Sequence, residues 1–408
     1  MKKFISIVLV MLICVSMITV FGGCSLPFGK GGTGSNNANE PAGLDKNGNV
    51  IFESAALEKK IIEHGEDKNG NTDIDANKDG KLSKDEILDL IRLPEINDGS
   101  NIDSLKGLEY ARNLTFLNIT LGSVSDLSPL SGLSTLKELS LINNKITDLT
   151  PLVGLSLLKY LHLYKNQISD ITPLAGLSSL EDLSLKSNNI SDITPLADLS
   201  LLTKLSVANN QIHDCTILSG LSSIESLNLS DNQISNITSL SGLSTLNVLD
   251  LGGNQISDIT PLIGITSLEQ LALASNKISD ITPLSRLSSL KKLYLARNTI
   301  SNLAALSGLS SLNYLDLIDN QISDITPLSE LSTLRILDLS NNQIANITSI
   351  AGLSSLSFLD LKNNQISGIT PLANLTALKD LYLVGNPITD TTPLKALAAK
   401  GCTIDIPV

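Results

Sequence analysis

The sequence predicts an α/β solenoid, with a parallel β-sheet on one concave face, short 3₁₀ turns on the other face and a small helical cap at the N-terminal end. The first observation behind this prediction is a phrase of fixed length, Leu-x-x-Leu-x-Leu-x-x-Asn-x-Ile, which returns every 22 residues. A fixed period of this size indicates one supersecondary unit stacked on itself. The asparagine of the phrase stands at Asn144, Asn166, Asn188, Asn210, Asn232, Asn254, Asn276, Asn298, Asn320, Asn342, Asn364 and Asn386.

The second observation is the alternation inside each phrase. From Tyr160 to Tyr164 successive side chains point to opposite faces of a strand, so the leucines enter the core while the tyrosines and His162 face out. Stacked copies then form one parallel sheet. The asparagine, with its side chain inside, can bond backbone groups of neighbouring coils that would otherwise be buried and unpaired.

The third observation concerns the second half of each phrase. Thr172 followed by Pro173 suggests a cap and a proline in the first helical position, which starts a short turn on the face opposite the strand. A column of aspartates precedes these turns, and turn chemistry explains it sufficiently. The column comprises Asp148, Asp170, Asp192, Asp214, Asp258, Asp280 and Asp324.

The phrase resembles the leucine-rich repeat, and its 22-residue period with Ser-Asp-Ile-Thr-Pro-Leu behind it resembles the internalin-type subclass of bacterial surface proteins. Repeats of this kind are expected over residues 93–394. The resemblance implies an adhesin-like or scaffolding protein that binds protein ligands, and an EF-hand-like cap on the first repeat. After Leu394 the phrase breaks, and residues 395–408 are expected to form a C-terminal cap strand that shields the last coil.

The N-terminal residues predict export and anchoring. Residues 1–23 have a basic start, an apolar run and small residues before Cys24, which is typical of a lipoprotein signal peptide. The Gly-Gly-Cys sequence looks like a bacterial lipobox, so Cys24 is expected to be lipidated and to hold the chain on the outer face of the membrane. The alternative is an uncleaved transmembrane anchor. Residues 24–50, rich in glycine and proline, predict a flexible tether.

Residues 51–92 predict a helical, EF-hand-like cap. A helix is expected over residues 52–64, and another from Ser83 to about Arg92 behind a capping box. Between them lies a loop with the residue types of an EF-hand at the demanding positions. We expect weak, structural calcium binding, on the order of 0.1 to 1 mM; the alternative is a metal-free cap. The expected ligands are Asp75, Asn77, Asp79, Lys81 (through its carbonyl), Ser83 and Glu86.

Composition narrows the function classes. The chain has 41 acidic against 29 basic residues, so nucleic-acid binding is not expected.

Cys215 and Cys402 are too many coils apart for a disulfide, and Cys215 occupies a core position. We expect a monomer. The sequence has three histidines and no zinc or phosphate-loop motif, which predicts a protein that is not an enzyme.

The candidate binding residues lie on the outward strand positions, which the repeat leaves free. Five of the six tyrosines fall there, a density typical of protein-binding surfaces, although tyrosine also simply suits strands. Near the C-terminal end, three aspartates about 4.8 Å apart should repel one another unless a cation meets them, which suggests a groove for a basic partner; the alternative is that these acids are merely solvated. The candidates are Tyr160, His162 and Tyr164 in one patch, and Tyr294, Tyr314, Asp316, Ile336, Asp338, Phe358, Asp360 and Tyr382 in the other.

Two other functions remain open from the sequence. Tyrosine and phenylalanine faces also pack on sugar rings, so a glycan-binding envelope protein is one alternative. A structural envelope spacer is the other. Membrane-anchored protein binding is the leading hypothesis.

Overall fold

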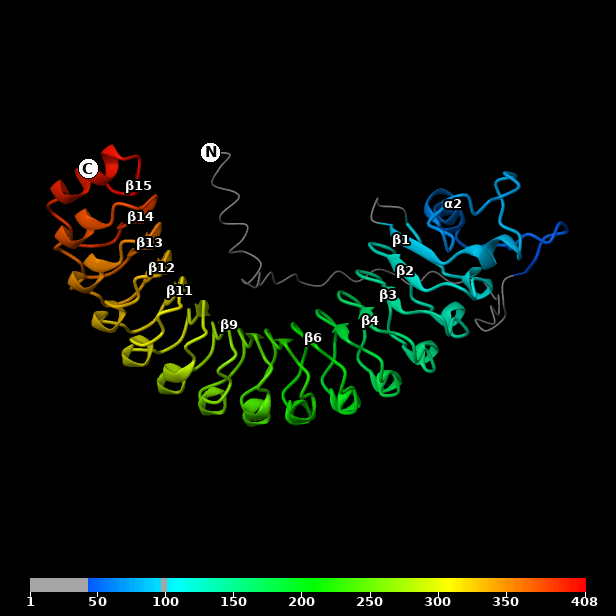
Figure 1. The fold of residues 1–408 in the computed structure, drawn as a ribbon, viewed down its shortest axis with the longest axis horizontal. Coiled ribbons are helices and arrows are strands. Elements are labelled where there is room, and N and C mark those ends of the chain that lie inside the picture. Colours follow the sequence, from blue (N-terminus) through cyan, green and yellow to red (C-terminus); the bar gives the residue numbers. More distant parts are fainter. Residues whose placement is uncertain (1–42, 97–100) are drawn as a thin grey trace, which may run out of the picture. The chain divides into compact units, whose positions relative to one another are not determined.

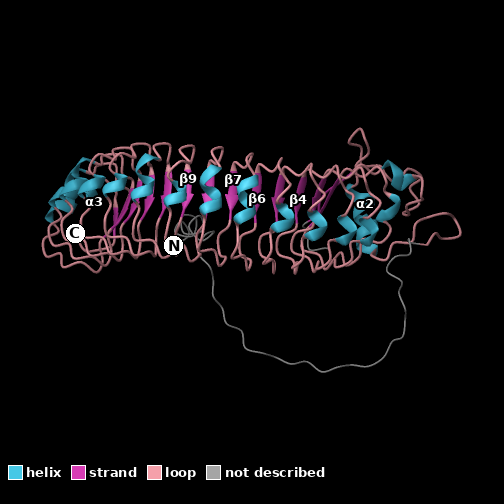
Figure 2. Cartoon of the chain, turned by 90° about the horizontal axis from the view of Figure 1, so that it is seen from below, coloured by secondary structure: helices cyan, strands magenta, loops and turns pink. Residues whose placement is uncertain are grey.

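The computed structural model describes residues 43–96 and 101–408, which belong to one compact unit. Within these residues fifteen strands pair in parallel, each with the next in chain order (Figure 1). The strands line the inner, concave side of the array and the short turns lie on the outer side (Figures 1 and 2). The prediction of an α/β solenoid is therefore confirmed.

The strands are short, and most have three residues. Their bounds are β1 Arg92–Ile96, β2 Phe116–Ile119, β3 Glu138–Ser140, β4 Tyr160–His162, β5 Asp182–Ser184, β6 Lys204–Ser206, β7 Ser226–Asn228, β8 Val248–Asp250, β9 Gln270–Ala272, β10 Lys292–Tyr294, β11 Tyr314–Asp316, β12 Ile336–Asp338, β13 Phe358–Asp360, β14 Asp380–Tyr382 and β15 Thr403–Ile404.

The helical elements of the described residues are two α-helices and a series of 3₁₀ turns. The α-helices are α2 Ala55–His64 and α3 Lys395–Ala399. The 3₁₀ turns are η2 Glu86–Asp89, η3 Leu108–Tyr110, η4 Ser128–Leu130, η5 Thr150–Leu152, η6 Thr172–Leu174, η7 Thr194–Leu196, η8 Thr216–Gly220, η9 Thr238–Gly242, η10 Thr260–Leu262, η11 Thr282–Arg286, η12 Ala304–Leu306, η13 Thr326–Leu328, η14 Thr348–Gly352, η15 Thr370–Asn374 and η16 Thr392–Leu394.

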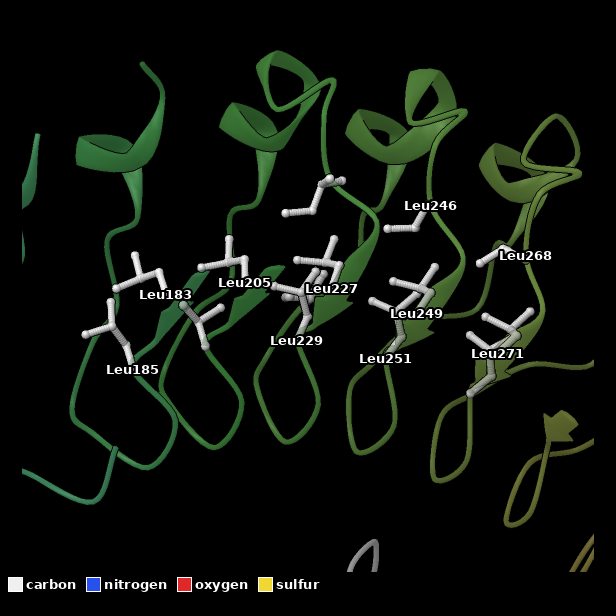
Figure 3. Close-up of a cluster of buried hydrophobic side chains, with 14 of the residues drawn as sticks. Leu183, Leu185, Leu205, Leu227, Leu229, Leu246, Leu249, Leu251, Leu268 and Leu271 are labelled. Carbon is white, nitrogen blue, oxygen red and sulfur yellow. The ribbon is translucent and has the colours of Figure 1, made fainter. Parts of the chain in front are cut away.

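The core is a stack of leucine and isoleucine columns between the sheet and the turns. Leu183, Leu205 and Leu227 lie in register on neighbouring strands, and all three are buried (Figure 3). Each such side chain stabilises the fold by about 1.5 to 3 kcal/mol through burial alone. Because every coil contributes the same set, the core is continuous along the whole array.

The asparagine ladder forms as predicted. Asn166 donates from Nδ2 to the carbonyls of Leu141 and Leu163, both at 2.9 Å, and its Oδ1 accepts the N–H of Ile146 at 3.1 Å. Two of these three bonds reach the preceding coil. The same backbone N–H bond recurs at each asparagine from Asn144 to Asn386, so the side chains tie every coil to the one before it.

Gly122 stands at the ladder position of the first coil for a steric reason. A Cβ at this residue would lie 2.6 Å from Asn144 Oδ1 and 2.7 Å from the carbonyl oxygen of Ile102. The side chain of Asn144 therefore occupies the space that a larger residue would need.

The 3₁₀ turns are capped by the aspartate column and not by threonine, which corrects one detail of the prediction. No threonine side chain caps η6; instead Asp170 Oδ1 accepts the N–H of Thr172 at 2.8 Å. The other predicted aspartates accept the N–H two residues later in the same way. The column is thus explained by turn chemistry, as expected.

The first predicted helix of the cap forms, but it begins at Ala55. Ser54 has extended backbone angles and its hydroxyl accepts the N–H of Leu57, so it is the N-cap.

The second predicted helix, from Ser83 to about Arg92, is wrong. The capping box is present, since Ser83 and Glu86 exchange two hydrogen bonds, yet only the turn η2 follows. The N–H groups of Ile91 and Arg92 donate to the carbonyl of Glu66, and Arg92 then enters β1. The backbone N–H groups that a helix would have used are therefore paired with Glu66, and the chain continues into the sheet.

The predicted tether of residues 24–50 ends too late. Residues 43–50 form a tight turn in which Leu44 pairs with Val50, and Asn49 pairs with Ser83 of the cap. Val50 is buried and its N–H donates to Leu82. Residues 1–42, with the predicted signal peptide and Cys24, lie outside the described residues.

The C-terminal cap contains the predicted strand and a helix that was not predicted. Strand β15 pairs with β14, and α3 precedes it with Leu397 buried against the last coil. Asp405 then accepts the N–H groups of Leu383 and Val384, closing the end of the array. Cys215 and Cys402 form no disulfide, and Cys215 is buried, as expected; Cys402 is buried as well.

Candidate functional site

The outward side chains of strands β2–β14, here called the strand face, form straight columns. Strands β10–β14 pair Lys292, Tyr314, Ile336, Phe358 and Asp380 in one column. The column beside it holds Tyr294, Asp316, Asp338, Asp360 and Tyr382. We call the eight predicted residues among these the C-terminal strip. The structure therefore brings together the C-terminal candidates as predicted.

Two aromatic pairs bound the C-terminal strip. The rings of Tyr294 and Tyr314 lie with centroids 4.7 Å apart, and those of Phe358 and Tyr382 with centroids 5.5 Å apart. Each pair joins neighbouring strands diagonally, a geometry that favours aromatic contacts. Between the pairs lie Ile336 and the three aspartates.

The aspartates do not form an open, solvated row, which was the alternative that the sequence left open. Asp338 is only 6% exposed and Asp360 only 4%. Each aspartate accepts the backbone N–H two residues later, and Asp338 also accepts the hydroxyl of Ser340 at 2.7 Å. These carboxylates thus cap the ends of their strands, and burial limits how much charge the face presents.

Burial also changes the protonation of this column. It raises the pKa of Asp338 to about 7, and the neighbouring carboxylates of Asp360 and Asp316 add to the effect. Burial likewise raises the pKa of Asp316 to about 6. An aspartate in water is fully ionised at pH 7, whereas Asp316 and Asp338 gain and lose their protons near neutral pH.

Within the described residues Lys362 forms an ion pair with this column, which the sequence reasoning missed. Lys362 Nζ lies 2.8 Å from Asp360 Oδ2 and 4.7 Å from the centroid of the Tyr382 ring. The spacing could have revealed it, because a residue two positions after an outward strand residue also faces out.

The N-terminal patch of Tyr160, His162 and Tyr164 is more polar than expected. The hydroxyl of Tyr160, a residue 38% exposed, donates to Glu181 at 3.3 Å. His162 Nε2 lies 3.3 Å from Asp182 Oδ1, an acid that the sequence reasoning had not placed beside it. Tyr164 is half-buried. The candidates therefore form two separate groups on one face, as predicted.

The candidate calcium loop is stabilised by hydrogen bonds from its backbone N–H groups to its own side-chain oxygens. Asp75 Oδ2 accepts the N–H of Gly80 at 2.9 Å, while Glu86 accepts the N–H groups of Asn77 and Ser83. Asp79 Oδ1 accepts the N–H of Lys81. The positive φ of Gly80 lets the loop turn here.

This loop offers oxygen donors of the kind that calcium prefers. Asp75 Oδ1 is buried and has no hydrogen-bond partner, so one carboxylate oxygen is available as a ligand. The carboxylates are not drawn together, however: across the described residues no three His, Cys, Asp or Glu side chains are grouped closely enough to hold a metal. The donor chemistry fits calcium, and a bound ion would have to close the loop.

Two other segments, which begin at Asp45 and Asp67, share the sequence Asp-Lys-Asn-Gly-Asn and start like calcium loops, but both form turns. Asp45 Oδ1 accepts the N–H groups of Asn47 and Asn49, and Asp67 Oδ1 does the same with Asn69 and Asn71. The carboxylates of both aspartates accept hydrogen bonds from the backbone of their own turn. Turn formation therefore explains these two sequences without a bound metal.

Residues 43–96 and 101–408 include no helix long and apolar enough to cross a membrane.

Comparisons with known proteins agree with this geometry. The model of the family described as leucine-rich repeats (2 copies) matches residues 156–198, 200–242, 244–286, 288–330, 332–374 and 354–396, more than half of the chain. No curated protein sequence matches.

Solved structures of bacterial proteins are similar over most of the chain. An internalin of Listeria monocytogenes (InlF) shares 31% identity with a TM-score of 0.73, covering 91% of this chain and 99% of that one. A leucine-rich repeat protein of Leptospira interrogans shares 24% identity with a TM-score of 0.69, covering 79% of this chain and 91% of that one. The functional domain of InlJ from Listeria monocytogenes shares 22% identity with a TM-score of 0.67, covering 78% and 73%. The latter two likenesses concern the fold alone.

Proposed function

The chain belongs to the leucine-rich repeat family and has the architecture of internalins, and from this premise we propose that it binds a protein partner on its strand face. The observation that carries the proposal is the C-terminal strip, where two aromatic pairs bound a row of partly desolvated carboxylates. Buried aromatic anchors and desolvated charges dominate protein interfaces. The matches indicate no enzyme family.

A comparison of partner capture by matched variants tests this proposal. Tyr314→Ala with Phe358→Ala should weaken capture of a specific partner by the full chain at least tenfold, because each ring supplies roughly 1.5 to 3 kcal/mol when buried. Val153→Ala changes an exposed residue at the end of η5, away from the strand face, and should leave capture unchanged. Capture that survives the double change would contradict the proposal, and sugar binding lost with Tyr294→Ala would favour a glycan receptor instead.

The cellular setting follows from the predicted leader. We propose an adhesin-like or scaffolding lipoprotein on the bacterial surface, held at the outer face of the membrane by lipid on Cys24. The mass of the N-terminal peptide from membrane-extracted protein tests this: a diacylglyceryl Cys24 supports the anchor, and an uncleaved Met1 excludes it.

For the cap we propose weak, structural calcium binding by Asp75, Asn77, Asp79, the carbonyl of Lys81, Ser83 and Glu86. The support is the loop's oxygen donors and the unpartnered Asp75 Oδ1. Calcium at 10 mM should stabilise the chain by about 1.5 to 3 kcal/mol if the dissociation constant is about 0.1 to 1 mM. Calorimetric titration and melting with and without chelator measure this.

A matched pair of variants makes the calcium test specific. Asp75→Asn should abolish the calcium response, whereas Asp67→Asn, in a turn of similar amino-acid sequence, should keep it. A chain that neither takes up heat nor changes its melting temperature with calcium has a metal-free cap.

A further inference from the structure

Lys362 shows which chemistry the C-terminal strip can hold. Its ammonium group lies between the Asp360 carboxylate at 2.8 Å and the face of the Tyr382 ring at 4.7 Å. An ion pair and a cation–π contact therefore act on one cation, and both strengthen where water is partly excluded. Asp360 and Tyr382 thus form a cation site on the strand face, and the chain's own Lys362 occupies it.

The repeat places a similar carboxylate one coil earlier, without a lysine. Asp338 is in register with Asp360, and the residue in the position of Lys362 is Ser340. Ser340 satisfies one carboxylate oxygen of Asp338 with its N–H and its hydroxyl. In the part of the chain that the structure describes, no basic side chain lies within ion-pair distance of Asp338.

The charge of the column is therefore unbalanced. Asp316, Asp338 and Asp360 face one ammonium group, that of Lys362, while Arg297 acts on Asp316 from a distance and pairs with Asp319. Burying an unpaired carboxylate is costly, and a cation brought to it recovers part of that cost. A basic partner residue complements the strip at Asp338, the most buried carboxylate without its own cation.

The aromatic pairs indicate the form of the partner. Tyr294 and Tyr382 stand four strands apart on the same column, about 19 Å at 4.8 Å per strand. An extended segment of about six residues covers this length at roughly 3.3 Å per residue. Its central side chain would meet Asp338 while its ends reach the two aromatic pairs.

Building on the proposed function, we propose that Asp338 receives a lysine or arginine side chain of an extended partner segment, in the manner in which Asp360 holds Lys362. Apolar side chains of the same segment pack on the two aromatic pairs. Lys362 stays in place and fixes the register, because it already occupies the site at Asp360.

Occupation of this site is coupled to pH. The groups facing Asp338 are Asp316 from β11, Asp360 from β13, and Ser340 and Lys362 from the loops that follow β12 and β13. Since burial raises the pKa of Asp338 to about 7, the carboxyl must release its proton to pair with a cation. Affinity for a basic segment should therefore rise roughly tenfold between pH 6 and pH 8.

The experiment titrates the full chain with two peptides, acetyl-Leu-Val-Arg-Val-Leu-amide and the same peptide with glutamine for arginine. The arginine peptide should bind at least tenfold more tightly at pH 8, and this preference should shrink at pH 6. Asp338→Asn, which keeps the acceptor for Ser340, should remove both the preference and the pH dependence. Glu330→Gln, an exposed acid beyond η13, should change neither.

Several outcomes overturn the inference: equal binding of the two peptides, no binding of the arginine peptide up to millimolar concentration, or an equal effect of Glu330→Gln. Its failure is distinguishable from failure of the proposed function. A natural partner lost with Tyr314→Ala but retained with Asp338→Asn refutes the basic-residue site and leaves strand-face binding intact.

Discussion

Replacing Asn254 with alanine is expected to lower the free energy of unfolding by about 2 to 4 kcal/mol, although the side chain touches no ligand. Asn254 Oδ1 accepts the N–H of Ile234 in the preceding coil at 2.9 Å, and no other acceptor takes this buried donor. Its Nδ2 donates to the carbonyls of Leu229 and Leu251. A third bond from Nδ2 goes to the carbonyl of Gly252 at 3.2 Å. Alanine therefore leaves one orphaned N–H and removes three further bonds.

Neighbouring asparagines of the ladder limit the number of carbonyls that lose all their hydrogen bonds. Leu229 also accepts from Asn232, and Leu251 also accepts from Asn276, so each keeps one partner in the variant. For this reason we expect a loss of a few kcal/mol and not the sum of all bonds. Urea denaturation of the full chain measures it. Asn247→Ala, at an exposed position of the same coil, is the control, and equal loss in both variants would contradict the ladder's role.

Replacing Asp338 with asparagine is expected to stabilise the protein at pH 8 by about 2 to 4 kcal/mol and to change nothing at pH 4 or below. The folded-state pKa of about 7 lies above the ordinary value of 3.8. Between these values the folded chain holds a proton that the unfolded chain has released. Stability therefore falls as pH rises through this window and levels off above about pH 7.

Asparagine carries no charge and still accepts from Ser340, so the variant should show a flatter stability curve. Melting curves from pH 4 to pH 8 for both proteins measure the difference. Glu330→Gln provides the matched control, since it removes an exposed carboxylate and should leave the slope unchanged. Parallel curves for wild type and Asp338→Asn would show that Asp338 is ionised like an ordinary surface acid.

The repeating features could be predicted because each coil imposes the same demand. The leucines, the ladder asparagines and the turn aspartates such as Asp170 recur at fixed spacing, and each satisfies a backbone or packing requirement that the spacing itself reveals. The register of the outward columns follows from the same period, which is why the members of the C-terminal strip could be named in advance.

The remaining features depend on contacts that a one-dimensional pattern does not contain. The helix expected after Ser83 failed because the carbonyl of Glu66, far back in the chain, takes the N–H groups of Ile91 and Arg92. The burial of Asp338 and Asp360 depends on what their neighbours cover, and alternation alone says only that they face outward. Asp182 meets His162 across a diagonal between strands, which the pairing of opposite residues does not indicate.

The central claim is that this chain recognises a protein through its strand face, and site-specific photo-crosslinking tests it most directly. A benzophenone side chain would replace Phe358, in the C-terminal strip, or Val153, which is 59% exposed at the end of η5. We expect the same partner to be crosslinked from position 358 and not from position 153. A partner crosslinked from position 153 alone would contradict the account.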